Sequence, residues 1–249
     1  MDESGQFETF RDEHGTWVVQ APFRSVDPQG RELAAAVLAA ATKKLKDDTK
    51  RTVSRHTLPD GRSWIVKNYR LTRWWALCPW YRHDHRCWNH TNRLAKLGFP
   101  VARTLAWLRC HDGSGCLFME DAGERRLRPT IMRLPIAEAR EIAAETGRLF
   151  ANLHGRRIFH TDLKPGNLML QPAGTPGGRI VLIDCDEIWY LRPITLALRV
   201  RNLGQFISDS DDQWLSPELI RVFLDAYLGA IPPNLRPAME RKLAKPPFC

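Results

Sequence analysis

One octapeptide in the second half of the chain carries side chains that could activate a hydroxyl and bind a cation. It runs from His160 to Asn167 in the pattern H-x-D-x-x-x-x-N, and Asp184 ends an apolar segment 22 residues after Asp162. A carboxylate such as that of Asp162 can orient a hydroxyl and accept its proton. Asn167 and Asp184 offer the oxygen ligands that Mg²⁺ prefers. Lys164 is placed to offset negative charge on a transferred group.

These two segments together resemble the catalytic loop and the metal-binding aspartate of protein-kinase-like phosphotransferases. The resemblance implies that Asp162 is the catalytic base and that Lys164 lies beside the transferred phosphoryl group. It further implies ATP and Mg²⁺ as cofactors, with Asn167 and Asp184 as metal ligands. Another interpretation remains open, in which Asp162 and Asn167 only bond the backbone of a turn.

The histidines near this loop admit two roles. The resemblance favours a bracing role for His160, the residue two positions before Asp162, and a structural role for His154. An imidazole also titrates near neutral pH, so histidine stays an alternative general base.

An antiparallel hairpin is predicted upstream. Residues Arg51–Thr57 and Ser63–Tyr69 read as two strands, and the segment 58–62, Leu-Pro-Asp-Gly-Arg, is a turn signal between them. The resemblance assigns Lys67, in the second strand, to the α and β phosphates of ATP. A solvated lysine on an edge strand is the alternative.

The hinge and two departures from the kinase pattern lie around this hairpin. Met119, Glu120 and Asp121 resemble the hinge whose backbone meets adenine. The turn at 46–50, before Lys67, contains no glycine for a phosphate loop. The predicted helix at 82–97 contains no glutamate to pair with Lys67, and its single acid is Asp84. Asp84 is therefore a weak candidate for that pairing, because an aspartate near a helix start also serves the N-terminus.

The chain is similar to the bacterial lipopolysaccharide kinases that phosphorylate Kdo or heptose in the inner core. The matching segments are WIVKNYR at 64–70, RCWN at 86–89, LAKLGFPV at 94–101, FHTDL at 159–163, LIDCD at 182–186 and RNLGQF at 201–206. This resemblance implies a sugar hydroxyl as acceptor and lipopolysaccharide or a lipid A–core precursor as partner. The run Lys164-Pro165-Gly166-Asn167 is closer to protein kinases, which keeps protein and small-molecule substrates open. The missing glutamate and glycines keep open a nucleotide-binding pseudokinase that recruits partners.

The length of 249 residues suits one small bilobal unit. We predict an α+β, protein-kinase-like fold with an N-terminal extension at 1–44, a small β-rich N-lobe at 45–121 and a mostly helical C-lobe at 122–249. Within the extension we expect a strand at 17–19 and an alanine-rich helix at 32–44. In the C-lobe we expect helices at 135–154 and from Ser216 to Gly229.

Positive charge and tryptophan gather in one part of the N-lobe. Between Arg62 and Arg109 there are ten Lys or Arg, one acid and six of the nine tryptophans, with the greatest density at 69–82. Arginine beside tryptophan suits an anionic membrane surface, although a packed core with a solvated basic face gives the same composition. No motif for nucleic acid accompanies the patch. A second basic cluster that could meet an acidic substrate consists of Arg125, Arg126, Arg128 and Arg133.

Cysteine use and hydropathy predict the compartment. The six cysteines form no C-x-x-C pair, the N-terminus has no apolar signal region, and no apolar run approaches the ~20 residues of a spanning helix. We therefore expect a cytoplasmic protein, peripheral on the inner membrane, and make no prediction of its oligomeric state. Zinc is a weaker alternative, carried by ligand types without a defensible spacing at Cys78, His83, His85, Cys87 and His90.

Overall fold

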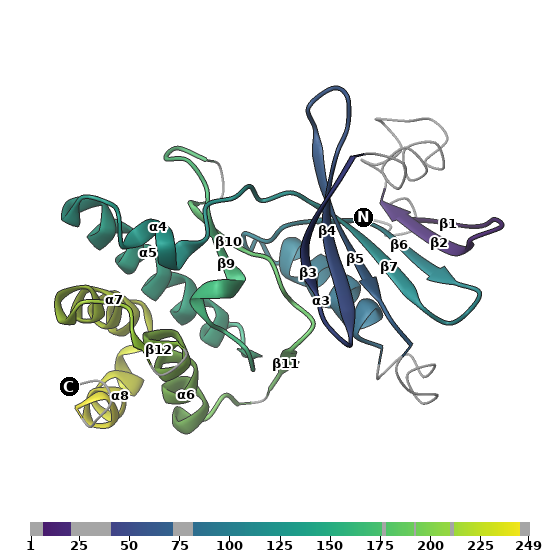
Figure 1. Ribbon diagram of the computed structural model, residues 1–249. Coiled ribbons are helices and arrows are strands. Elements are labelled where there is room, and N and C mark those ends of the chain that lie inside the picture. The colour runs from purple at the N-terminus through teal and green to yellow at the C-terminus, as the bar shows by residue number, and fades with distance from the viewer. Residues whose placement is uncertain are drawn as a thin grey trace. The chain divides into compact units, whose positions relative to one another are not determined.

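The computed structural model describes residues 7–20, 41–71, 82–175, 178–191, 193–209 and 212–244. The chain divides into two compact units, unit 1 (Met1–Asp121) and unit 2 (Ala122–Cys249). Figure 1 shows the two units and labels most of their helices and strands.

Unit 1 is built on a seven-stranded antiparallel sheet with the order β1-β2-β6-β7-β5-β4-β3. Its strands are β1 (Phe7–Arg11), β2 (Gly15–Gln20), β3 (Ala41–Asp47), β4 (Arg51–Thr57), β5 (Ser63–Tyr69), β6 (Thr104–Cys110) and β7 (Gly115–Glu120). One helix, α3 (His83–Lys96), packs against β6 and β7 of this sheet (Figure 1).

The sheet buries one set of alternating side chains. In β2, Trp17 and Val19 are buried and their neighbours are half-buried, which is the period of two that a strand with one covered face requires. They form a cluster with Val66 of β5, Leu108 of β6 and Phe118 of β7. This core fixes the central strands, β5 and β7, on which the predicted lysine and hinge are carried.

The hairpin predicted upstream of Lys67 is confirmed. Strands β4 and β5 begin and end at the predicted residues and pair in register from Arg51 with Tyr69 to Thr57 with Ser63. The alanine-rich helix predicted at 32–44 is wrong for its last four residues. These belong to β3, where Ala41 to Lys44 pair with Thr57 to Ser54 of β4. The remainder of that prediction lies outside the described residues, as do residues 72–81 of the tryptophan-rich segment.

Unit 2 is mostly helical. Its helices are α4 (Leu127–Ile131), α5 (Ile136–Gly155), α6 (Leu196–Ile207), α7 (Pro217–Ala230) and α8 (Arg236–Leu243), with short 3-10 turns η4 (Pro165–Asn167) and η5 (Pro233–Leu235). Its short strands pair as three antiparallel couples, β8 (Ile158–His160) with β11 (Ile188–Tyr190), β9 (Leu168–Leu170) with β10 (Ile180–Leu182), and β12 (Ser208–Asp209) with β13 (Asp212–Gln213).

The core of unit 2 forms where α5, α6 and α7 meet. A Cβ at Gly147 of α5 would lie 2.3 Å from the carbonyl oxygen of Phe223, so the close approach of α5 to α7 requires glycine there. Phe150, Phe206 and Phe223 pack with ring centroids 4.8 to 5.4 Å apart. As predicted, α7 begins with a capping serine, because Ser216 Oγ accepts the N–H of Leu219. Figure 1 shows α5 and α7 side by side.

Among the described residues, no helix has the length and apolar composition that crossing a membrane requires.

Candidate active site

The loop between β8 and β9 brings three predicted site residues together. Asn167 Nδ2 donates to the carbonyl oxygen of Asp162 at 2.8 Å and to its carboxylate Oδ2 at 3.0 Å. Lys164 Nζ lies 3.1 Å from the same Oδ2, and both side chains of this pair are nearly half exposed. All described contacts of the Asp162 carboxylate therefore go to Oδ2, and its predicted role as the base stays a prediction.

Strand pairing brings Asp184 to this loop. The register of β9 with β10 sets Leu168 opposite Leu182, and one step further the N–H of Ile183 donates to the carbonyl of Asn167 at 3.1 Å. Asp184 follows immediately, so it lies beside the end of the catalytic loop although 17 residues separate it from Asn167. The proximity is a consequence of the apolar strands, since Leu168 and Leu182 are fully buried.

His160 braces the loop, because both of its ring nitrogens form hydrogen bonds with the backbone. Its Nδ1 accepts the backbone N–H of Asp162 at 3.2 Å, which assigns the ring proton to Nε2, and Nε2 donates to the carbonyl of Asp184 at 2.7 Å. The side chain is buried, and this burial lowers the pKa of His160 below its ordinary value. The alternative of His160 as general base is therefore wrong, and the bracing role is confirmed.

His154 is structural as well. Its Nδ1 lies 3.0 Å from the hydroxyl of Tyr227, and its Nε2 lies 3.1 Å from Oδ1 of Asn202. Burial lowers its pKa from 6.5 to about 4. With both nitrogens bonded and the ring buried, His154 does not serve as a base.

Two polar side chains of α6 form hydrogen bonds with the backbone of the loop. Asn202 Nδ2 donates to the carbonyl of His160 at 2.8 Å, and Gln205 Nε2 donates to the carbonyl of Thr161 at 2.8 Å. Arg199, also on α6, donates through Nη2 to the carbonyl of His154 and through Nη1 to the hydroxyl of Tyr227, both at 3.3 Å. Sequence reasoning did not find these roles. The segment 201–206 entered only as part of the family resemblance.

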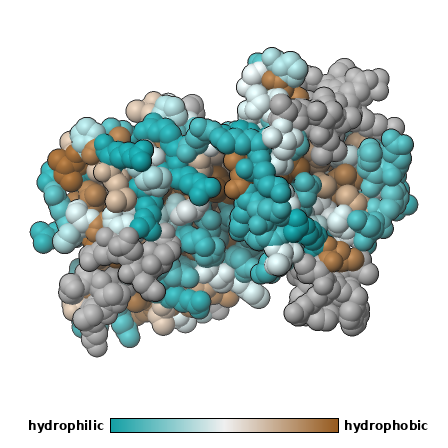
Figure 2. All heavy atoms as spheres, viewed as in Figure 1, coloured by the Kyte–Doolittle hydropathy of each residue, from teal (hydrophilic) through white to brown (hydrophobic). Residues whose placement is uncertain are grey.

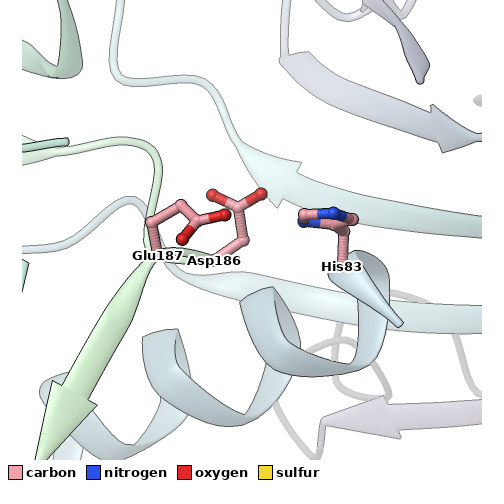
Figure 3. A group of neighbouring side chains, drawn as sticks. All are labelled: His83, Asp186 and Glu187. Carbon is pink, nitrogen blue, oxygen red and sulfur yellow. The ribbon is translucent and has the colours of Figure 1, made fainter. Parts of the chain in front are cut away.

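Two further acids follow Asp184. Asp186 is buried, and Glu187 accepts the Thr161 hydroxyl at 3.2 Å through Oε2, while its carbonyl accepts the Thr161 N–H at 2.8 Å. Figure 3 shows their two carboxylates where the chain leads into β11, and it also draws His83 in the first turn of α3. Burial lowers the pKa of His160, and the negative charges of Asp184, Asp186 and Asp162 oppose that shift.

This concentration of acids fits a divalent cation. Hard cations such as Mg²⁺ take carboxylate and amide oxygens, and Asp184 supplies the first kind. Because Asn167 Nδ2 is committed to Asp162, its Oδ1 is the atom that can ligate a cation. The residues present therefore suit the magnesium that the resemblance implies.

In unit 1, Lys67 lies in the middle of the sheet. It pairs in register with Val53 of β4 and Leu117 of β7, and only 6% of its surface is exposed. The alternative of a solvated edge lysine is therefore wrong. Its predicted contact with ATP phosphates stays a prediction.

The side chains of the predicted hinge bind other residues of unit 1. Asp121 Oδ1 accepts Nη2 of Arg55 at 3.1 Å, and Oδ2 lies 2.6 Å from Arg55 Nε in a nearly buried ion pair. Glu120 is paired with Arg103, and its backbone N–H donates to the Arg103 carbonyl at 2.9 Å. The contact with adenine that the resemblance implies for the backbone of Met119 to Asp121 stays a prediction.

Asp84 has a different partner from the one considered in the sequence. Its carboxylate accepts Nε and Nη2 of Arg82 at 3.1 and 2.6 Å, and Oδ2 also accepts the indole N–H of Trp107 at 2.8 Å. Arg82 continues to the carbonyls of Gly113 and Ser114 at 2.8 and 3.2 Å. This buried pair anchors the start of α3 to the turn between β6 and β7.

The proposed zinc ligands have no common geometry in the part of the chain that the structure describes. Cys87 is buried, with its sulfur 4.0 Å from the Thr91 hydroxyl, and His85 lies beside Asn89. Cys78 lies outside the described residues.

Comparisons with known proteins give likeness in structure alone, because no protein-family model and no curated protein matches the chain. A structure of WaaP in complex with acyl carrier protein matches with a TM-score of 0.61 at 20% identity, covering 92% of this chain and 98% of WaaP. A Rio2 kinase structure from Chaetomium thermophilum, a complex with ADP, Mg²⁺ and phosphoaspartate, matches with a TM-score of 0.53 at 14% identity. It covers 97% of this chain and 80% of Rio2.

The antiparallel sheet of unit 1 and the helices of unit 2 therefore form an α+β, protein-kinase-like fold, as predicted. At 20% and 14% identity, the likeness to WaaP and to Rio2 kinase shows this fold.

Proposed function

We propose that the protein is an ATP- and Mg²⁺-dependent kinase that phosphorylates a sugar hydroxyl, of Kdo or heptose, in the lipopolysaccharide inner core. The observation that carries this proposal is the contact of Asn167 and Lys164 with one oxygen of Asp162. It holds a half-exposed carboxylate in one orientation with its second oxygen turned to the acceptor side. A protein released from catalysis has no need of this arrangement.

Each residue has a distinct task in this proposal. Asp162 Oδ1 orients the acceptor hydroxyl and takes its proton, while Lys164 offsets charge on the phosphoryl group. ATP supplies the phosphoryl group, and Mg²⁺ neutralises charge on its phosphates when both are bound. Asn167 Oδ1 and the Asp184 carboxylate hold the cation, and the His160 bridge keeps Asp184 at a fixed place relative to Asp162.

Nucleotide contacts in unit 1 come from Lys67 and the hinge in the same proposal. A buried lysine in a central strand is held in one conformation and can bind the α and β phosphates. The backbone at Met119 to Asp121 would contact adenine. The rigid Arg55–Asp121 pair supports that segment.

The acceptor implies the location. Core sugars are built on lipid A, so the enzyme would act at the cytoplasmic face of the inner membrane. The basic, tryptophan-rich residues 69–82 are one candidate for attachment there. Acyl carrier protein, which is bound in the WaaP structure, is a further partner to test.

The test uses core oligosaccharide from cells that contain or lack this protein, compared by mass spectrometry. We expect one phosphate fewer in cells without the protein, and its restoration by the wild-type gene but not by Asp162→Asn. Purified protein with ATP and Mg²⁺ should add the same phosphate to the deficient lipopolysaccharide. Unchanged oligosaccharide in both arms would overturn the choice of acceptor.

One observation favours a second function, that of a nucleotide-binding pseudokinase. Asp84, the sole acid of α3, is committed to Arg82 and Trp107. The carboxylate of α3 therefore serves the anchoring of this helix in unit 1. A protein that binds ATP but transfers no phosphate to lipopolysaccharide, proteins or small molecules would fit this alternative.

A further inference from the structure

The segment at the start of unit 2 has one buried and one exposed side. Leu127 and Ile131 of α4 are buried, with 0% and 3% of their surface exposed. Met132 and Ile136, just beyond them, are 63% and 49% exposed, although both side chains are large and apolar. Exposed aliphatic side chains of this size that lie close together mark an interaction site more often than isolated ones do.

Arginines flank these two apolar residues in the sequence. Arg125, Arg126 and Arg133 are exposed, and Glu124 is the only acid between residues 122 and 137. Exposed Arg140 of α5, by contrast, is paired with Glu218. Within the described ranges, no carboxylate lies in ion-pair distance of Arg125, Arg126 or Arg133.

Figure 2 shows hydrophobic surface next to hydrophilic surface at the end of unit 2 where α4 and the start of α5 lie. We call the five side chains Arg125, Arg126, Met132, Arg133 and Ile136 the α4 surface.

The α4 surface is attached to the catalytic loop. The carbonyl of Arg125 accepts the N–H of Leu170 at 2.7 Å, and Arg126 forms a β-bridge with Met169. Helix α4 also packs against η4 and β9, the elements that contain and follow Asn167. A partner bound to this surface would therefore have a fixed position relative to the loop that carries Asp162.

From these observations we propose that the α4 surface binds an anionic lipid bilayer, with Met132 and Ile136 inserted among the lipids and the three arginines at the headgroups. Charge complementarity favours this occupant, because cations with apolar neighbours suit the boundary between headgroups and acyl chains. The α4 surface includes no residue of the segment 69–82. Lipid binding by this surface would present a lipid-linked acceptor to the catalytic loop, and only this purpose rests on the proposed function.

Co-sedimentation of the full chain with vesicles, without ATP, tests the proposal. Wild-type protein should bind vesicles of phosphatidylethanolamine and phosphatidylglycerol, should bind vesicles of phosphatidylethanolamine and phosphatidylcholine far less, and should be released by salt. Each basic residue near an anionic surface contributes roughly fivefold to binding. The triple variant R125E/R126E/R133E should therefore bind at least about 100-fold more weakly.

Two more variants make the result specific. R148E/R221E/R241E reverses three exposed arginines on α5, α7 and α8 with the same change in net charge, and it should retain most binding. M132S/I136S should bind several-fold more weakly with an unchanged dependence on salt, since it removes inserted apolar groups only. Circular dichroism should show wild-type secondary structure for all three, because every substituted side chain is exposed.

Several outcomes would overturn the proposal. They are wild-type binding by R125E/R126E/R133E, an equal loss in the control triple, and equal binding of both vesicle types by the wild-type protein. Binding to polyglutamate but not to anionic vesicles would assign the surface to an acidic protein instead. The Asp162→Asn variant should bind vesicles as the wild type does, so a failure of kinase activity and a failure of lipid binding remain distinguishable.

Discussion

The side-chain amide of Asn202 reaches from α6 to the backbone carbonyl of His160, 2.8 Å away and 42 residues earlier in the chain. Oδ1 of the same side chain accepts a hydrogen bond from Nε2 of His154 at 3.1 Å. One buried side chain therefore connects α5 and α6 to the loop that contains Asp162. His160 in turn fixes Asp162 and Asp184 through its two nitrogens. Asn202 is therefore a positioning residue that acts through His160.

We predict that Asn202→Ala lowers kcat by about 10- to 100-fold, since small displacements of a catalytic group are costly. The affinity for ATP should stay near that of the wild type, because Asn202 touches no nucleotide-binding residue. The variant also leaves two buried polar groups without a partner, which should cost about 1–3 kcal/mol of unfolding free energy. Asn152→Ala, an exposed asparagine on α5, is the matched control. Equal losses of kcat and ATP affinity would indicate general damage rather than misplacement of the loop.

Replacement of the base tests the chemistry directly. Asp162→Asn should reduce phosphoryl transfer at least about 100-fold, because the amide cannot accept a proton from the acceptor hydroxyl. ATP binding should be nearly unchanged. Turnover is measured with the true acceptor at saturating ATP. Wild-type turnover in this variant would rule out Asp162 as the base.

Magnesium dependence should reside in Asp184 and Asn167. In Asp184→Ala the affinity for ATP should no longer rise when Mg²⁺ is added, and in Asn167→Ala the rise should be smaller, since each substitution removes one oxygen ligand. Titration calorimetry with Mg²⁺ or with chelator measures the difference. Asp225→Ala, an exposed acid on α7, should behave as the wild type. Equal ATP affinity of wild-type protein in both conditions would contradict the metal assignment.

The arrangement of the loop at 160–167 can be predicted from the sequence because its contacts are local. Asp162, Lys164 and Asn167 lie within six residues, and a short turn is enough to bring them to one carboxylate oxygen. The hairpin before Lys67 is predictable for the same reason, since turn and alternation lie in one stretch. Asn202 could not be found in this way. A buried asparagine gives the same local pattern as an exposed one, and its partner comes from another element.

Long-range pairing also explains the errors. The alanine-rich run that ends at Ala41, followed by a threonine and two lysines, favours helix through residue 44, but pairing of the backbone along β4 overrides that preference. The sequence offers Asp84 as a partner for Lys67 because Asp84 is the only acid in the predicted helix that follows the strand of this lysine. The carboxylate instead meets Arg82 and Trp107 above Gly115, where a Cβ would lie 2.0 Å from its Oδ2.

Acid should destabilise the protein through its buried histidines. Burial lowers the pKa of His154 from 6.5 to about 4, so the folded protein keeps this ring neutral while the unfolded chain takes up a proton below pH 6.5. The stabilisation is thus complete above pH 6.5 and is lost as the pH falls toward 4. Between pH 7 and pH 5 we expect a loss of about 2 kcal/mol from this residue. His160 adds to it in the same direction.

Urea denaturation at pH 7 and pH 5 measures this loss. The His154→Gln variant should be less stable than the wild type at pH 7 and should lose less stability on acidification. If wild type and variant lose the same amount, the acid sensitivity comes from other groups.

The last prediction concerns Asp84, whose two assignments lead to opposite results. As an anchor, it neutralises Arg82, and only 4% of the Arg82 side chain and 2% of the Asp84 side chain are exposed. Asp84→Ala leaves that guanidinium buried without its counterion, and breaking such a pair costs about 3–5 kcal/mol. We therefore expect a large fall in unfolding free energy, with a smaller fall in Arg82→Leu/Asp84→Leu, which removes both charges.

ATP affinity, measured well below the melting temperature, decides between the anchor and the partner of Lys67. An anchor loses stability while the remaining folded protein binds ATP with nearly wild-type affinity. A partner of Lys67 loses ATP affinity to the same extent as Lys67→Met, with little change in melting temperature. That second pattern would assign Asp84 to the nucleotide, whereas the bonds of its carboxylate to Arg82 and Trp107 favour the first.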